Sequence, residues 1–141
     1  MNLSMVTDLY ELSMANGYQQ ALEKEDGVFD VFFRHVPDDG SFVITAGLAQ
    51  GIQAVSDFHF GEKDLTYLKN LDLFTDNFLN FLKKFKFSGN ISAIPEGTPV
   101  FPREPLLTIS GPLIETQLFE TILLNIVNHQ SLIATKARRI C

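Results

Sequence analysis

Apolar residues recur four positions apart near the start of the chain: Tyr10, Met14, Tyr18 and Leu22. This spacing is typical of one stripe on a helix and predicts a helix from about Thr7 to Lys24. Thr7 or Asp8 can cap its start, and Asp8 with Glu11 three residues later resembles a capping box. The chain therefore opens on a helix that carries an apolar, partly aromatic stripe.

The pattern changes to alternation after this helix. The segment from Val28 to Val36 alternates two sets of side chains and predicts a strand. Pro37–Gly40 has the composition of a turn, and Ser41 to Thr45 forms a second short β-type run. Two strands joined by such a turn suggest a β-hairpin.

Helical spacing returns in the middle of the chain. Short amphipathic helices are predicted after Gly47 and from near Gly61, and a third opens at Phe74–Asp76. The buried face of the third is expected to carry four large side chains: Phe78, Phe81, Leu82 and Phe85. Because the chain has 13 Phe and no Trp, we expect a core built largely from Phe rings.

Proline interrupts the short β-type runs of residues 87–112, which hold Pro95, Pro99, Pro102 and Pro105. Because proline stops long central strands, this stretch predicts a compact module of short strands and tight turns. Leu113 to about Arg139 is again helical, with a break expected near His129–Ser131. The whole predicts an α+β fold, in which residues 1–112 form an N-terminal domain that includes the module.

The helical pattern is still running where the sequence stops, at Ile140 and Cys141. Complete domains seldom end in this way, because helices usually carry a stop signal. We therefore expect residues 113–141 to begin a helical segment that continues in a longer protein.

Charge and cysteine content argue against several classes of protein. The chain has 17 acidic and 11 basic side chains and a net charge of −6, which argues against nucleic-acid binding. The single cysteine, Cys141, excludes an intrachain disulfide and fits a reducing compartment. No apolar run approaches the roughly 20 residues of a membrane span, and the N-terminus lacks the basic head of a signal peptide. We expect a soluble cytoplasmic protein that binds neither nucleic acid nor membrane.

Common catalytic and phosphate-binding motifs are missing from the sequence. It has no Gly-x-Gly-x-x-Gly or Walker pattern, no Cys-x-x-Cys and no His-Glu-x-x-His. His35, His59 and His129 match no ligand spacing. We therefore expect no metal site in this portion and identify no catalytic residue in it.

Three stretches carry candidate binding residues, and each has a purely structural alternative. Residues 7–10 place Tyr10 at a capped helix start, which suits an anion or a planar ring, or else simply caps the helix beside a core tyrosine. Arg34 stands on an apolar strand, where it pairs with an acid or a phosphate or faces solvent at an edge. Thr135–Arg139 is a cationic cluster, which also offsets a helix dipole.

Five blocks of sequence, in order along nearly the whole chain, resemble the motifs of one family. The blocks are Thr7–Tyr18, Val31–Arg34, Ile44–Leu48, Pro95–Leu107, and Glu120–Asn125 followed by Ile133–Arg138. Taken together they resemble the nicotinate phosphoribosyltransferases. The resemblance implies a type II phosphoribosyltransferase, with an N-terminal α+β domain that leads into an incomplete α/β barrel.

The same resemblance implies an activity and its partners. Enzymes of this family form nicotinate mononucleotide from nicotinate and phosphoribosyl pyrophosphate in NAD biosynthesis, with ATP hydrolysis and Mg²⁺. It also implies a homodimer whose pocket is shared between subunits. The phosphorylated histidine of the family and the phosphate-binding loops of its barrel have no match here. We therefore expect these 141 residues alone to be inactive.

The resemblance assigns binding roles to five residues. Tyr10 matches a tyrosine that stacks on the pyridine ring across the dimer interface, and Asp8 is expected to orient that ring or its loop. Arg34 matches an arginine that approaches the phosphates of the ribosyl donor, and a guanidinium can hold a phosphate bidentately. Thr135 and Arg138 fall in a segment that lines the barrel entrance.

Two alternatives to this interpretation remain. A relative specific for another pyridine is one, but related quinolinate enzymes have an arginine where this chain has Thr121. Quinolinate carries one more carboxylate than nicotinate, so threonine favours the monoacid, whereas only the overall motif match disfavours nicotinamide. The other alternative is a stand-alone truncated module for dimerisation or regulation, supported by the amphipathic closing helix.

Overall fold

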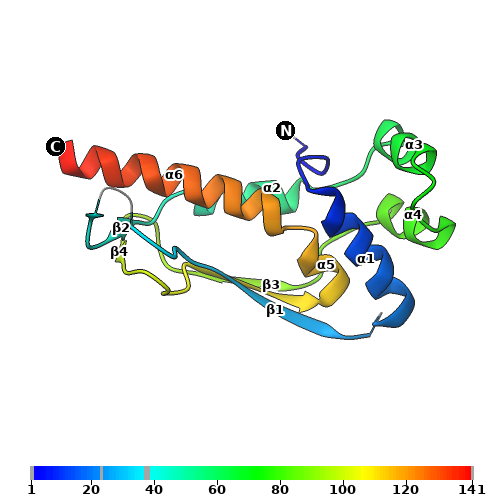
Figure 1. Cartoon of the computed structure of the whole chain (residues 1–141), viewed down its shortest axis with the longest axis horizontal. Coiled ribbons are helices and arrows are strands. Elements are labelled where there is room, and N and C mark those ends of the chain that lie inside the picture. Colours follow the sequence, from blue (N-terminus) through cyan, green and yellow to red (C-terminus); the bar gives the residue numbers. More distant parts are fainter. Residues whose placement is uncertain (1, 23, 37–38, 141) are drawn as a thin grey trace.

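The structure, a computed structural model, describes residues 2–22, 24–36 and 39–140 and has an α+β architecture (Figure 1). Its helices are α1 (Leu9–Ala21), α2 (Leu48–Ser56), α3 (Glu62–Asn70), α4 (Asp76–Lys83), α5 (Leu113–Gln117) and α6 (Glu120–Ile140). Its strands are β1 (Asp26–Val31), β2 (Val43–Ile44), β3 (Asn90–Ala93), β4 (Pro99–Val100) and β5 (Leu107–Pro112). The α+β fold expected from the sequence is confirmed. None of the described helices combines the length and the apolarity that crossing a membrane requires.

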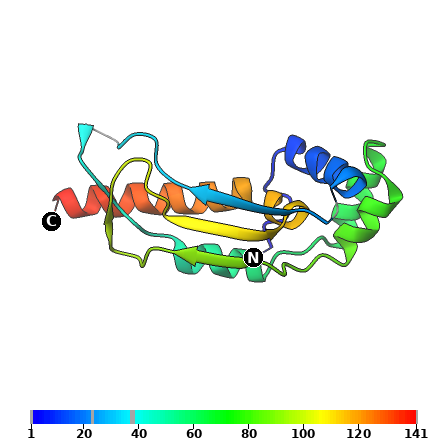
Figure 2. The same ribbon diagram turned by 90° about the horizontal axis from the view of Figure 1, so that it is seen from below.

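β5 is the central strand of the main sheet. It pairs antiparallel with β1 on one side and with β3 on the other, so that Ile109 stands opposite both Phe29 and Ile91. Figure 2 shows β5 between these two strands, with α6 behind the sheet. β2 and β4 form a separate two-stranded ladder.

The predicted hairpin between the first two strands is wrong. β1 ends at Val31, earlier than predicted, because its partner is the distant β5, and Leu106 just before β5 donates its N–H to the Val31 carbonyl at 2.8 Å. The second strand pairs with β4 instead. Two residues of the predicted turn, Pro37 and Asp38, lie outside the described residues.

Phe rings build the centre of the core, as the composition predicts. The ring centroid of Phe58 lies 4.8 Å from that of Phe119 and 5.3 Å from that of Phe85, both in edge-to-face geometry. Such pairs are favourable because the positive ring edge meets the negative ring face. The core therefore joins the end of α2, the end of α4 and the start of α6.

α4 begins where its sequence predicts. Thr75 occupies the N-cap position, and its Oγ1 accepts a hydrogen bond from the Phe78 N–H at 3.2 Å. Phe78 and Leu82 are fully buried on the helix, whereas Phe81 is half-buried. The face predicted for this helix is therefore largely confirmed.

α1 does not bury the stripe that its spacing predicts. Its buried residues are Glu11, Leu12 and Ala15, whereas Tyr10 is 47% exposed and Met14 is 40% exposed. Asp8 occupies the N-cap position without a side-chain cap hydrogen bond. The predicted capping box is not formed, because the Glu11 carboxylate is bonded to the start of α6 instead.

The closing helix is broken at a different place from the one predicted. α5 ends at Gln117 and α6 runs through His129–Ser131 without a break. Ser131 does not disturb α6, because its hydroxyl bonds outward: it accepts from the Ala46 N–H at 3.0 Å and donates to the Ala46 carbonyl at 3.1 Å. This side of α6 is thereby fixed against the segment that follows β2.

Candidate functional site

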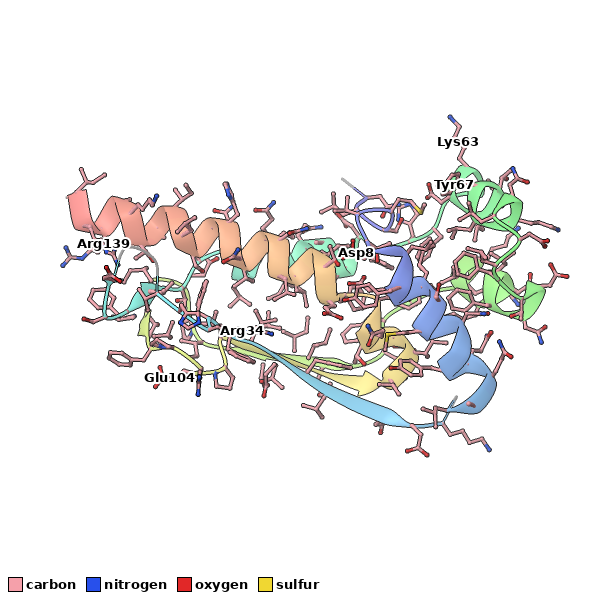
Figure 3. The ribbon with its side chains drawn as sticks, in the orientation of Figure 1. Asp8, Arg34, Lys63, Tyr67, Glu104 and Arg139 are labelled. Carbon is pink, nitrogen blue, oxygen red and sulfur yellow. The ribbon has the colours of Figure 1, made fainter. Side chains whose placement is uncertain are left out.

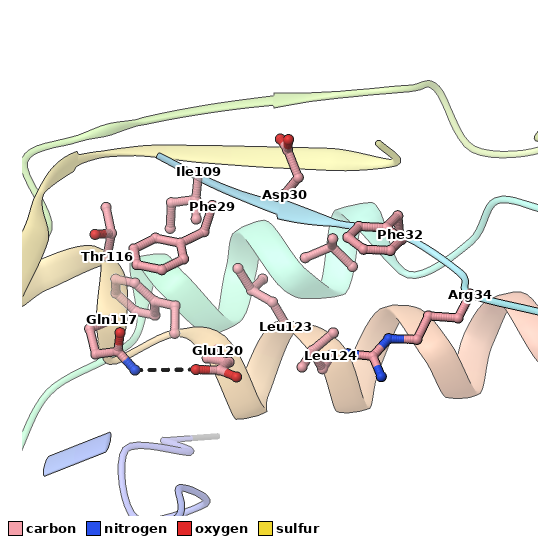
Figure 4. A pocket seen from close by; sticks show the side chains of 12 residues that line it. Phe29, Asp30, Phe32, Arg34, Ile109, Thr116, Gln117, Glu120, Leu123 and Leu124 are labelled. Carbon is pink, nitrogen blue, oxygen red and sulfur yellow. Dashed lines mark hydrogen bonds between the residues drawn. The ribbon is translucent and has the colours of Figure 1, made fainter. Parts of the chain in front are cut away.

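A pocket of about 280 Å³ lies where the chain leaves β1 and passes the start of α6 (Figure 4). Phe29, Phe32 and Arg34 border it from the side of β1, and Gln117, Glu120 and Leu124 border it from α5 and α6. The amide of Gln117 donates to a Glu120 carboxylate oxygen at 3.2 Å. The pocket thus combines aromatic walls with polar groups from three elements.

Arg34 is exposed and reaches from the continuation of β1 toward Leu124 (Figure 4). It also borders a neighbouring hollow of about 480 Å³, which continues along α6 to Asn128. No carboxylate within the described ranges pairs with its guanidinium, and Asp30 nearby accepts a hydrogen bond from Thr108 at 2.6 Å instead. The structure thus gives Arg34 no acidic partner among the described residues and places it, exposed, between two hollows; binding of a phosphate by this arginine stays a prediction.

Tyr10 stands beside this pocket, and Glu120 links the two. Partial burial of the phenol and the neighbouring Glu120 carboxylate, followed by the charges of Glu11 and Asp8, raise the pKa of Tyr10 to about 12. The ring is nevertheless 47% exposed, so it is not the core tyrosine of the structural alternative. The phenol stays protonated at neutral pH and offers an exposed aromatic surface.

We expect the phenol of Tyr10 to titrate near pH 12. Because the folded pKa lies above the ordinary value of 10, the associated stability is fully present below pH 10 and is lost as the pH rises toward 12. The measurement is the phenolate absorbance of the wild type minus that of Tyr10→Phe, with circular dichroism recording the fold at each pH. Glu120→Gln is expected to lower the midpoint, and a difference curve centred at pH 10 would contradict the assignment.

The other residues assigned from the resemblance lie in different surroundings. Asp8 is exposed beside Tyr10, at the N-cap of α1. Thr135 is 2% exposed, and its hydroxyl accepts from the Ile44 N–H at 2.9 Å and donates to the Ser131 carbonyl at 2.6 Å. This hydroxyl therefore holds β2 against α6, and its predicted contact with substrate stays a prediction.

Arg138 lies in the last turn of α6, far from this pocket. A helix rises about 1.5 Å per residue, so Arg138 is roughly 27 Å along α6 from Glu120, and Thr135 is roughly 22 Å. Figure 3 shows the neighbouring Arg139 at one end of the molecule, whereas Asp8 lies well away from it, near the start of α6. The structure therefore brings Asp8, Tyr10 and Arg34 to one region and leaves Thr135 and Arg138 outside it.

The sequence interpretation missed the polar floor of the pocket. Gln117 and Glu120 stand three residues apart among Leu, Phe and Ile residues, which is a usable signal for polar groups on one side of this segment; Gln117 is buried and Glu120 is exposed. In the sequence, Glu120 stands out only as the first residue of a motif, Glu120–Asn125. Phe29 and Phe32 were assigned to a strand without a binding role, and both are partly exposed in the pocket.

No group of three or more His, Cys, Asp or Glu side chains within residues 2–22, 24–36 and 39–140 could hold a metal ion. The part of this portion that the structure describes thus presents no such donor cluster. The chemistry that it offers is a guanidinium, an aromatic ring and hydrogen-bonding groups.

Comparisons with known proteins agree with the motif order. Residues 5–128 match the family described as the N-terminal domain of nicotinate phosphoribosyltransferase (NAPRTase). The chain is 42% identical over 137 residues to a nicotinate phosphoribosyltransferase of Mycobacterium tuberculosis, covering 97% of this chain and 30% of the relative. It is 40% identical over 140 residues to the Bacillus subtilis enzyme, covering 99% of this chain and 29% of that relative.

A solved structure gives the same result. The fold matches the crystal structure of human nicotinic acid phosphoribosyltransferase with a TM-score of 0.86 and 39% sequence identity, over 94% of this chain and 27% of the human chain. The chain thus spans less than a third of the length of these relatives. Its match along almost every described element means that the chain belongs to the nicotinate phosphoribosyltransferase family, in the N-terminal domain of that family.

Proposed function

We propose that this chain is the N-terminal part of an enzyme that forms nicotinate mononucleotide from nicotinate and phosphoribosyl pyrophosphate in NAD biosynthesis. The observation that carries the proposal is the match to the family along nearly the whole chain, at about 40% identity with bacterial relatives. The pocket supports it, because an aromatic ring and an exposed guanidinium suit a planar pyridine and an anionic donor.

In this proposal Arg34 binds the phosphates of the ribosyl donor. The pyridine nitrogen displaces pyrophosphate at the anomeric carbon, so negative charge grows on the leaving group. A planar guanidinium can donate two parallel hydrogen bonds to a phosphate and neutralise part of that charge. The support is the exposed position of Arg34 between the two hollows.

Tyr10 is proposed to stack on the pyridine ring, with Asp8 and Glu120 beside its hydroxyl. Stacking uses the face of the aromatic ring, and Tyr10 is 47% exposed. The exposed apolar residues around Tyr10 on α1, Leu9 and Met14, fit a pocket that two subunits of a homodimer share. ATP and Mg²⁺ belong to the same proposal through the family alone, and no step is assigned to a metal on these residues.

The test is a turnover assay on the complete protein, with nicotinate, nicotinamide and quinolinate offered in turn with the ribosyl donor. We expect turnover of nicotinate in preference to the other two, and no turnover by the 141-residue chain alone, because it spans less than a third of its relatives. Liquid chromatography of the mononucleotide product measures both. Turnover of nicotinate by the short chain at the rate of the complete protein would contradict this assignment.

A second candidate function is a stand-alone dimerisation or regulatory module. The exposed Leu9, Tyr10 and Met14 on one helix favour it, since exposed apolar patches mark interaction surfaces. The same assay separates the two functions. A complete protein without nucleotide product, together with a well-defined dimer of the short chain in gel filtration, would favour the module.

A further inference from the structure

Glu11 is a buried carboxylate that joins two helices distant in sequence. It is fully buried on α1, next to the exposed Tyr10. One of its oxygens accepts from the Thr121 N–H at 3.0 Å and from the Thr121 hydroxyl at 2.5 Å, and the other accepts from the Thr7 hydroxyl. Burying a carboxylate is costly unless it is well hydrogen-bonded, so these bonds explain why a charged residue can face inward here.

The bond to Thr121 also completes the start of α6. The Phe119 carbonyl accepts from the Leu123 N–H at 3.0 Å, which puts Phe119 in the N-cap position, where its side chain has no oxygen to offer. The N–H groups of the first turn then need an acceptor from elsewhere, and a negative charge is favourable at a helix N-terminus. Glu11 on α1 supplies both the acceptor oxygen and the negative charge.

The residues that precede Glu11 and Thr121 lie at or next to the pocket. Tyr10 precedes Glu11 on α1, and Glu120 precedes Thr121 on α6. The hydrogen bonds between Glu11 and Thr121 therefore place Tyr10 and Glu120 beside each other at the rim of the pocket. The effect of the Glu120 carboxylate on the pKa of Tyr10 is consistent with their proximity.

We propose that Glu11 is a positioning residue for the pyridine substrate: through Thr121 it fixes the Tyr10 ring against Glu120 beside the pocket. The inference rests on the proposed function. Glu11 itself is buried and touches no ligand, so it acts through the place and orientation of Tyr10. Loss of the hydrogen bonds between Glu11 and Thr121 should therefore weaken the binding of the pyridine more than the binding of the ribosyl donor.

The experiment compares Glu11→Leu and Glu11→Gln in the complete enzyme. Leucine removes every acceptor, and we expect it to raise the KM for nicotinate about tenfold while the KM for phosphoribosyl pyrophosphate changes less than about twofold. Glutamine keeps one carbonyl oxygen for Thr121 and should recover most of the affinity. In a Tyr10→Ala background, Glu11→Leu should raise the KM for nicotinate no further, since the residue through which it acts is already gone.

Two further measurements separate positioning from general destabilisation. Hydrogen exchange followed by mass spectrometry should show faster exchange at the start of α6 in Glu11→Leu. Thr75→Ala removes the N-cap of α4, away from the pocket, and should lower stability without changing either KM.

Three results would overturn the role of Glu11: additive effects of Tyr10→Ala and Glu11→Leu, equal increases in KM for both substrates, or unchanged exchange at the start of α6. The absence of nicotinate turnover in the complete wild-type protein would instead overturn the proposed function. The wild type alone shows that result, so the two failures can be distinguished.

Discussion

Replacing Arg34 by alanine in the complete enzyme is expected to raise the KM for phosphoribosyl pyrophosphate roughly 10- to 100-fold, since hydrogen bonds to charged groups contribute about 1.5–3 kcal/mol. The physical reason is the loss of a guanidinium that lies beside the pocket and has no carboxylate partner among the described residues. Because Arg34 is exposed, the free energy of unfolding should change by less than about 0.5 kcal/mol. Steady-state kinetics with the ribosyl donor as the varied substrate measure the effect.

Two matched variants make this prediction specific. Arg34→Lys keeps the charge but loses the planar fork, so its KM should fall between those of the wild type and Arg34→Ala. Lys63→Ala removes a cation from α3, which Figure 3 shows far from Arg34, and should leave the KM unchanged. An unaltered KM in Arg34→Ala would remove this residue from the donor site.

The largest expected effect on stability comes from Phe119→Ala, which we expect to lower the free energy of unfolding by about 3–5 kcal/mol. Phe119 is fully buried, and its ring meets the edges or faces of the rings of Phe58, Phe85 and Phe87 at centroid distances of 4.8, 5.9 and 5.1 Å. Removing it leaves a cavity where α6 begins. Such a loss is a large fraction of the roughly 5–15 kcal/mol that stabilises an ordinary domain.

Urea unfolding followed by circular dichroism measures this loss, and Phe101→Ala serves as the control. Phe101 is 54% exposed, so its truncation should cost less than about 0.5 kcal/mol. A difference below about 1 kcal/mol between the two variants would mean that Phe119 does not hold the core together.

Elements with complete local signals could be predicted from the sequence. α4 is an example, because Thr75 supplies a cap and the spacing of Phe78 and Leu82 supplies the buried face. The pairing of the strands could not be predicted, because β5 contacts both β1 and β3 and no local pattern encodes which distant strand is the partner. Turn-forming residues next to a predicted strand favour a hairpin in the sequence, even where the strand pairs with a distant partner in the structure.

The candidate site divides in the same way. Tyr10 at a capped helix start and Arg34 on an apolar strand stand out from their local sequence, and the motif order adds their roles. The structure puts Arg34 at the border of the pocket and Tyr10 next to Glu120, which also borders it. Polar residues on apolar helices were harder to interpret, because their partners are remote: the hydroxyl of Thr135 bonds the backbone of Ile44, and Glu11 bonds Thr121. Charge and spacing alone do not distinguish such hydrogen bonds within the protein from contacts with a ligand.

The contact between Glu11 and Thr121 also bears on how the chain folds during synthesis. These residues are 110 positions apart, and ribosomes add about 5–20 residues per second, so roughly 5 to 20 s separate the synthesis of the two. Over that interval the carboxylate has only water and its near neighbours as partners. The nascent first helix therefore cannot reach its final environment until most of this domain has left the ribosome.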